Sequence, residues 1–118
     1  MFPTPAPKLF KNTYDFESKP MVKPTGFREY DARWLFGDEI NLMGVQALGM
    51  GLGTLLGEMG VKREIVTGHD YRSYSSSIKL ALATGLMAAG CKVHDIGLAV
   101  TPMAYFAQFD LDVPAVAM

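Results

Sequence analysis

Charged and aromatic side chains crowd the stretch FREYDARW, residues 27–34. Arg28 and Arg33 are always protonated, and their forked N–H donors suit the oxygens of a phosphate group. Tyr30 lies between the two arginines in the sequence and offers a hydroxyl that could contact a sugar. The stretch therefore indicates an anion-binding site, and ordinary surface ion pairs are the alternative interpretation.

The other side chains with catalytic potential form no recognisable set. His69 falls at the carboxyl end of a predicted strand, where it could face a ligand, whereas His94 falls within a strand and is expected to be a packed imidazole. Cys91 is expected to pack as a small core residue. No His or Cys set has metal-ligand spacing, so no metal site is predicted. The serines lack a nucleophile elbow or a nearby base, and we expect one to cap a helix: Ser73, Ser75, Ser76 and Ser77.

Hydrophobic periodicity alternates between strand and helix along the chain. The predicted strands are 26–34, 63–68, 91–96 and 113–118, and the predicted helices between them are 42–59, 78–89 and 102–110. Asn41 and Thr101 are the expected N-caps of the first and last helices, and Gly60 and Gly90 should end the first two. This order predicts an α/β fold, a three-layer α/β/α sandwich with a four-stranded mixed, mostly parallel sheet. Ligands of such sheets bind beyond the carboxyl ends of the strands.

The composition is that of one globular domain. The 118 residues are 49% hydrophobic and 19% charged, and the formal net charge is −1. A charge this close to zero recruits neither nucleic acid nor acidic lipid. The single cysteine excludes an internal disulfide, and no signal peptide opens the sequence, so a cytoplasmic protein is expected.

One apolar stretch, residues 42–60, raises the alternative of a membrane span. It is almost uncharged, and its glycines at positions 49, 53 and 57 repeat as they do where membrane helices pack closely. Polar residues interrupt the stretch, however, and no aromatic belt or positive cluster flanks it. We therefore favour a buried helix whose glycines admit a close neighbour, and predict no membrane association.

The first 24 residues differ from the rest of the chain. Prolines stand at positions 3, 5, 7, 20 and 24, and lysines at 8, 11, 19 and 23. Each proline fixes φ and removes a backbone donor. We therefore divide the chain into an extended, helix-free arm at 1–24 and an α/β domain at 25–118.

Taken in order, four segments resemble the first domain of the α-D-phosphohexomutases, a family that includes phosphomannomutase and phosphoglucomutase enzymes. The segments are FREYDARW (27–34), GHDYRSYSS (68–76), AAGCKVHDIGLAVTPMAYFA (88–107) and VPAVAM (113–118). The family motif F-R-x-Y-D-I-R-G is altered at Ala32 and Trp34, and His69 stands where the family's usual G-R-D has arginine. Trp34 makes the loop after the predicted strand bulkier than the family's glycine does.

The resemblance implies an activity and two site residues. Such enzymes interconvert hexose 1-phosphate and hexose 6-phosphate, of mannose or glucose, through a phosphoserine and with Mg²⁺. By this resemblance, Tyr30 would touch the sugar phosphate and Arg33 would stabilise the phosphoryl group. The family's phosphoserine loop, T-A-S-H-N-P, follows the strand that corresponds to VPAVAM. The domain at 25–118 is therefore expected to be incomplete at its C-terminus and to lack the nucleophile. The chain is also expected to bind no metal itself, to be inactive alone and to work with the remaining mutase domains.

Two interpretations from other functional classes stay open at this point. One is a stand-alone sugar-phosphate-binding module, and the other is an oligomerisation unit that uses the glycine-faced helix. A reading frame that continues past residue 118 into a Ser-His-Asn loop would favour the enzyme, and a native stop codon would favour the other two. Self-association is also expected, since an inter-domain face of about 600–1,500 Å² would lie bare.

Overall fold

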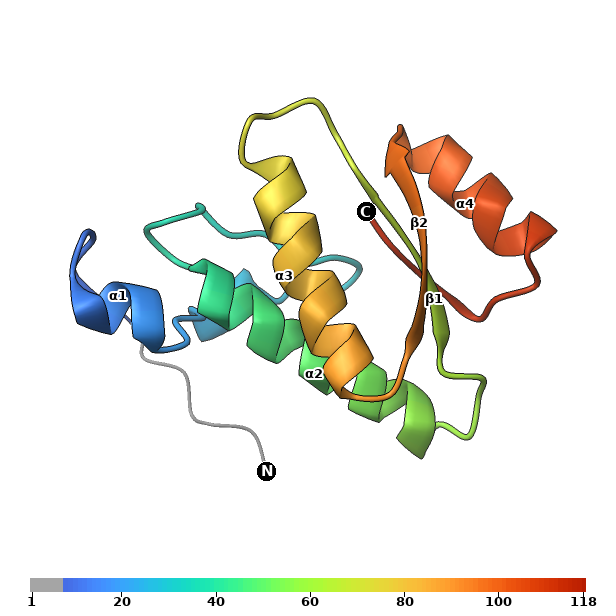
Figure 1. Ribbon diagram of the computed structural model, residues 1–118, viewed down its shortest axis with the longest axis horizontal. Coiled ribbons are helices and arrows are strands. Elements are labelled where there is room, and N and C mark those ends of the chain that lie inside the picture. The colour runs from blue at the N-terminus through green and yellow to red at the C-terminus, as the bar shows by residue number, and fades with distance from the viewer. Residues whose placement is uncertain (1–7) are drawn as a thin grey trace.

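The computed structural model describes residues 8–118, and its main elements form three layers (Figure 1). The middle layer is a parallel sheet with the strand order β2-β1-β3, made of β1 (Glu64–His69), β2 (Lys92–Leu98) and β3 (Ala115–Ala117). Helices α2 (Leu42–Glu58) and α3 (Ser75–Ala88) lie on one side of the sheet, and α4 (Thr101–Asp110) lies on the other. The predicted α/β class and α/β/α layering are therefore confirmed.

The strand predicted at residues 26–34, and with it the four-stranded mixed sheet, is wrong for the described residues. The sheet has three strands within residues 8–118, and all of them are parallel. A 3₁₀ turn, η1 (Pro24–Gly26), opens the segment, and the chain then doubles back on itself. Local contacts close the resulting loop: a bridge between Phe27 and Ala32, and backbone hydrogen bonds from Arg28 to Asp31 and from Arg33 to Gly26. These bonds use backbone groups that a sheet strand would need. The segment therefore forms a hairpin-like loop, although its side chains alternate as they do in a strand.

The main core fills the space between the sheet and the pair α2 and α3. Ile65 of β1 packs there with Leu56 of α2 and Leu86 of α3. Cys91 belongs to the same cluster, as predicted, and its burial raises the pKa of the thiol. A second cluster, built on Val22, Ile40 and Val45, lies where the N-terminal segment joins α2.

Helices α2 and α3 approach each other closely because the glycines of each helix face a glycine and backbone atoms of the other. A side-chain carbon added at Gly49 would collide with the carbonyl oxygen of Leu82, and one added at Gly85 with that of Gln46. The interpretation of residues 42–60 as a buried helix with a close neighbour is confirmed. None of the helices in the described part of the chain combines the length and the apolar character that a bilayer crossing requires.

The prediction of a helix-free arm over residues 1–24 is wrong for its second half; residues 1–7 lie outside the described residues. A short helix, α1 (Tyr14–Ser18), forms there with Thr13 as its N-cap. It forms because the prolines at positions 7 and 20 bracket a stretch without proline. Further along, Met21 is completely buried and Val22 is 5% exposed, so this segment contributes to the core of the fold.

Helix boundaries follow the predictions in part. Asn41 caps α2 by accepting the N–H of Gly44, and Gly60 and Gly90, which follow α2 and α3, take positive φ angles of 70° and 82°. The predicted caps of the other two helices are wrong. Helix α4 begins at Thr101 itself. Tyr74 precedes α3, whose first serine hydroxyl instead bonds to a side chain in the preceding loop.

Candidate functional site

The carboxyl ends of all three strands meet at one edge of the sheet, since the strands are parallel. The edge is formed by His69 of β1, Leu98 of β2 and the end of β3, which precedes Met118. The loop at 70–74 leaves this edge toward α3, and residues 99–100 leave it toward α4. Ligands of open α/β sheets bind at such an edge.

Asp70 organises the loop that follows β1. Its carboxylate accepts hydrogen bonds from the backbone N–H of Arg72 at 3.1 Å and from the Arg72 guanidinium at 2.8 Å, and a third from the Ser75 hydroxyl. The bond from Ser75, followed by that from the Arg72 backbone, lowers the pKa of Asp70. Asp70 therefore stays ionised and fixes the start of α3, which leaves little of its bonding capacity for a ligand.

An ion pair with one largely buried partner, Lys79, lies between β2 and α3. Lys79 Nζ is 2.7 Å from Asp95 Oδ2, and the side chain of Lys79 is only 10% exposed. Asp95 also accepts the backbone N–H of Gly97 at 2.9 Å. Burial raises the pKa of Asp95, but the hydrogen bonds from Lys79 and Gly97 outweigh it and the pKa is lowered. The sequence analysis missed this pair; the signal for it was a lysine in an otherwise apolar helix.

Two polar atoms of β1 are buried close to the carboxyl edge. The hydroxyl of Thr67, a residue with no exposed surface, and Nδ1 of His69 have no hydrogen-bond partner among residues 8–118. Ile65, two residues before Thr67, packs against α2 and α3. Side chains two apart on a strand point to the same face, so the Thr67 hydroxyl lies on that side of the sheet. Buried polar atoms are normally paired, and this place suits a water molecule or a hydroxyl.

The loop at 27–34 presents the two predicted site residues to solvent. The side chain of Tyr30 is 91% exposed. Arg33 Nε is 2.7 Å from Asp31 Oδ2, and the Arg33 side chain is 78% exposed. Arg33 therefore makes a surface ion pair while most of its side chain faces solvent.

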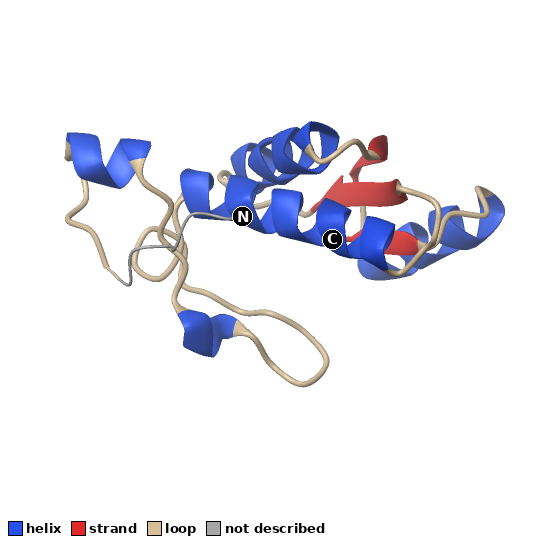
Figure 2. Ribbon diagram, turned by 90° about the horizontal axis from the view of Figure 1, so that it is seen from below, coloured by secondary structure: helices blue, strands red, loops and turns tan. Residues whose placement is uncertain are grey.

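Trp34 anchors this loop. Its indole N–H donates to the carbonyl of Lys23 at 2.8 Å, and its ring meets that of Phe27 edge to face at 5.1 Å between centroids. Just after it, Phe36 stacks on Tyr74 of the loop that leaves β1, at 5.4 Å. The base of the loop is therefore joined to the carboxyl edge of the sheet, and the loop itself projects from the body of the molecule (Figure 2).

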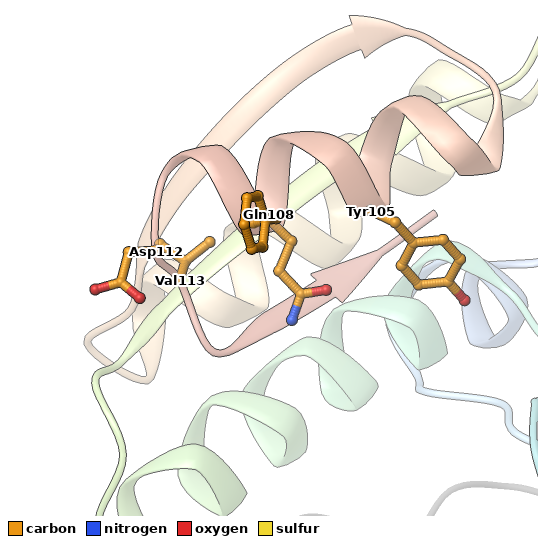
Figure 3. Close-up of a pocket in the computed structure, with 5 residues that line it drawn as sticks. Tyr105, Gln108, Asp112 and Val113 are labelled. Atoms are coloured by element: carbon orange, nitrogen blue, oxygen red, sulfur yellow. The ribbon is translucent and has the colours of Figure 1, made fainter.

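The remaining candidates lie apart from this edge. His94 bonds to Glu64, the first residue of β1, at 2.7 Å, and is a packed imidazole as predicted. A shallow pocket beside α4 is lined by two aromatic rings and polar side chains, and Asp112 is its charged residue (Figure 3); the lining is Tyr105, Gln108, Phe109, Asp112 and Val113. No group of three His, Cys, Asp or Glu side chains in the described ranges could hold a metal ion, so these residues do not fit a resident Mg²⁺.

Comparison with known proteins identifies the relatives of the chain. Residues 24–118 match the family model described as phosphoglucomutase/phosphomannomutase, alpha/beta/alpha domain I. A phosphomannomutase of Escherichia coli is 44% identical over 93 residues, which are 79% of this chain and 20% of that protein. A phosphomannomutase of Vibrio cholerae is 39% identical over 94 residues, again 79% of this chain and 20% of the relative.

One further relative has a name that states a different activity. A probable phosphoglucosamine mutase of Pyrococcus furiosus is 50% identical over 60 residues, or 51% of this chain and 12% of that protein. The chain spans about a fifth of the length of the first curated relatives it matches. The match covers all three strands and the loop at 27–34. The chain therefore belongs to the phosphoglucomutase/phosphomannomutase family, whose domain I its residues 24–118 match.

Proposed function

We propose that this chain is the first domain of a phosphohexomutase that moves a phosphoryl group between the 1 and 6 positions of a hexose. The observation that carries the proposal is the match of residues 24–118 to domain I of the family. Relatives named phosphomannomutase support mannose phosphates as substrates, and glucose phosphates are the second class. The catalytic serine and the other mutase domains lie outside these 118 residues in this proposal, and the enzyme works in the cytoplasm.

In this enzyme Arg33 is the phosphoryl-stabilising residue and Tyr30 contacts the sugar phosphate. Phosphoryl transfer depends on positioning and on neutralising the charge spread over the phosphate oxygens. Arg33 is suited to this because its ion pair with Asp31 uses Nε. Its two Nη groups have no hydrogen-bond partner within residues 8–118, so they can donate as a fork to phosphate oxygens.

The hexose itself would lie over the carboxyl edge of the sheet, between the loop at 27–34 and the end of β1. Support comes from the stacking of Phe36 on Tyr74, which joins the loop to that edge. Asp70 holds the loop that leaves β1 through its bonds to Arg72 and Ser75. The Mg²⁺ expected of such an enzyme would have its ligands outside the described residues, and no step is assigned to it here.

The test uses the longer enzyme that contains this domain. Arg33→Ala should lower kcat/KM for mannose 1-phosphate by about 10²–10³, the usual effect of losing a preorganised donor. Arg33→Lys should restore activity in part, because lysine keeps the charge but lacks the fork. Tyr30→Phe should cost less, since it removes only a hydroxyl.

Arg28→Ala is the matched control, because Arg28 lies on the same loop and contributes a backbone bond that alanine keeps. It should retain more activity than Arg33→Ala. Equal losses in the two variants, or near wild-type activity in Arg33→Ala, would contradict the assigned role of Arg33. An enzyme inactive on hexose phosphates in its wild-type form would contradict the proposed function itself.

A further inference from the structure

The loop at 27–34 is closed by bonds within its own segment, and those bonds do not fix its direction relative to the sheet. Arg28 donates its backbone N–H to the carbonyl of Asp31, and Arg33 donates to that of Gly26. Each bond joins two parts of the same short stretch of chain. A group that binds a reacting phosphoryl must be held within about 0.5 Å of its productive place. Contacts outside the loop must therefore set the orientation of Arg33.

The first outside contact is made by Trp34, and it runs to the chain on either side of the loop. The indole N–H donates to the carbonyl of Lys23 at 2.8 Å, and the indole ring fills the space where a side-chain carbon at Gly26 would lie. Lys23 is bonded in turn to Glu39, through its backbone N–H at 2.8 Å and through its ammonium group at 2.6 Å. Trp34 therefore anchors the loop to its own flanking segments.

The second outside contact is the stack of Phe36 on Tyr74, and it runs to the carboxyl edge of the sheet. The ring centroids lie 5.4 Å apart, and the ring planes differ by 26°. A tight turn fixes the backbone after Phe36, since Gly37 donates its N–H to the carbonyl of Ile40 at 2.8 Å. Phe36 comes three residues after Arg33, a span of at most roughly 11 Å. A shift of the Phe36 ring would therefore also shift Arg33.

Tyr74 is held firmly enough to serve as the fixed side of this contact. Its carbonyl accepts the N–H of Ile78 at 3.1 Å, so its backbone continues into α3. The next residue, Ser75, donates its hydroxyl to Asp70 and its N–H to the carbonyl of Arg72. Asp70 directly follows β1. The ring of Tyr74 is therefore presented from a base that includes both the end of β1 and the start of α3.

We propose that Tyr74 is a positioning residue of the mutase: its stack on Phe36 holds the loop at 27–34 in the orientation that lets Arg33 reach a phosphoryl group over the carboxyl edge of the sheet. The inference rests on the proposed role of Arg33 and names the contact through which the sheet directs that arginine. Anchors at two places fix an orientation, whereas Trp34 alone would leave the loop free to swing about one end. Tyr74 acts through Phe36 and does not touch the substrate.

The activity test uses the longer enzyme that contains this domain. Tyr74→Ala should lower kcat/KM for mannose 1-phosphate by about 3–10-fold, the order of effect that the loss of one aromatic stack produces. Tyr74→Phe should stay within about 2-fold of wild type, because phenylalanine keeps the ring that stacks. Tyr71→Ala is the matched control: it removes the same side chain from the same loop, at a position that is 87% exposed, and should also stay within about 2-fold.

A double-mutant cycle separates positioning of Arg33 from a general structural effect. In the Arg33→Ala background, Tyr74→Ala should cost less than about 2-fold, because the group that Tyr74 positions is gone. A loss of the same size in both backgrounds would overturn the proposal. A loss in Tyr74→Phe or in Tyr71→Ala as large as that in Tyr74→Ala would overturn it too, since the stack would then not be the cause.

Amide hydrogen exchange of the 118-residue chain tests the contact without any activity. The backbone N–H groups of Leu35 and Gly37, which flank Phe36, are both hydrogen-bonded. Tyr74→Ala should speed their exchange by about 3–10-fold and leave the amides of β1 unchanged, because only the loop is released. Tyr71→Ala should change neither set.

Exchange at the wild-type rate in Tyr74→Ala would show that the stack does not hold the loop, and the proposal would fail. Failure of the proposed function gives a different result. In that case the wild-type enzyme would not act on hexose phosphates, while the exchange rates would still show whether Tyr74 fixes the loop.

Discussion

Asn41 joins the N-terminal segment to the rest of the molecule through one side chain that is 2% exposed. Its Oδ1 accepts the backbone N–H groups of Met21 at 2.9 Å and Gly44 at 2.7 Å, so it caps α2 and fixes the preceding segment at once. Its Nδ2 donates to the carbonyls of Phe16 and Lys19. Only an amide side chain has donors and acceptors for all of these bonds.

Asn41→Ala should lower the free energy of unfolding by about 2–4 kcal/mol, because it removes an N-cap and leaves several buried backbone groups unpaired. Urea denaturation followed by circular dichroism measures the loss. Thr13→Ala is the control, since Thr13 caps only the short, exposed helix α1, and it should cost less than about 1 kcal/mol. Similar losses in the two variants would show that Asn41 acts as a cap alone.

Glu64 and His94 form a second long-range contact, near the amino end of the sheet. The hydrogen bond from His94 is the main reason why the pKa of Glu64 lies below its ordinary value of 4.5, and the charge of Lys92 lowers it further. When folding lowers the pKa of a carboxyl group, its ionised form stabilises the folded state at pH values above the pKa of the unfolded state. That stabilisation is lost as the pH falls through the lower pKa of the folded state.

Glu64→Gln should therefore destabilise the protein at pH 7, and the difference from wild type should shrink as the pH is lowered from about 4.5. Chemical denaturation at a series of pH values measures this difference. Glu29→Gln, on the exposed loop at 27–34, controls for the loss of a negative charge. A Glu64→Gln difference that stays constant between pH 7 and pH 3 would contradict the linkage.

At the scale of elements, the crossing of α2 and α3 decides how tightly one side of the sheet is covered. Gly49 and Gly85 lie where the two backbones meet, and neither position has room for a side chain. Alanine has a higher helix propensity than glycine by about 1 kcal/mol. Helix propensity and packing therefore make opposite predictions for a Gly→Ala change at this crossing.

Gly49→Ala should lower the free energy of unfolding by about 1–3 kcal/mol, because the added methyl group meets the backbone of Leu82 and the helices must move apart. Gly57→Ala, in the same helix, is the control. There the added carbon meets only the flexible guanidinium of Arg63, and the result should lie within about 1 kcal/mol of wild type. Thermal denaturation of both variants compares them, and a stabilised Gly49→Ala would refute close packing at the crossing.

At the scale of the whole molecule, the site proposed for a mutase would be built only in part from these 118 residues. Arg33 and Tyr30 point outward on a projecting loop, and no described pocket brings them together with a nucleophile. At the carboxyl edge of the sheet, the carboxylates of Asp70 and Asp95 are already bonded to neighbouring side chains. The substrate would therefore need contacts that the 118 residues do not supply.

The isolated chain should accordingly show no mutase turnover. The assay supplies mannose 1-phosphate or glucose 1-phosphate with Mg²⁺ and a hexose bisphosphate activator, and follows formation of the 6-phosphate. The same preparation of Arg33→Ala controls for contaminating enzyme, since a contaminant would act equally in both. Turnover in the wild-type chain that disappears in Arg33→Ala would refute the expected inactivity.

The sequence by itself determined the elements whose signals are local. The cap at Asn41 and the stops at Gly60 and Gly90 depend on residues within one or two helical turns, and the structure has all three. The parallel strands followed from the alternation of strand and helix, which forces each connection to cross the sheet. The resemblance of the four ordered segments was sufficient to identify the family, because a comparison of sequences needs no knowledge of contacts in space.

Only the tertiary structure decided which distant residues meet. The stretch at 27–34 alternates like a strand, yet its backbone bonds close on themselves and no sheet edge takes it up. Met21 is in the core because Asn41, twenty positions later, holds its backbone N–H, and Lys79 is buried because β2 carries Asp95 beneath it. A pattern along the chain shows which side chains share a face, but the order of strands and the packing of helices determine what that face contacts.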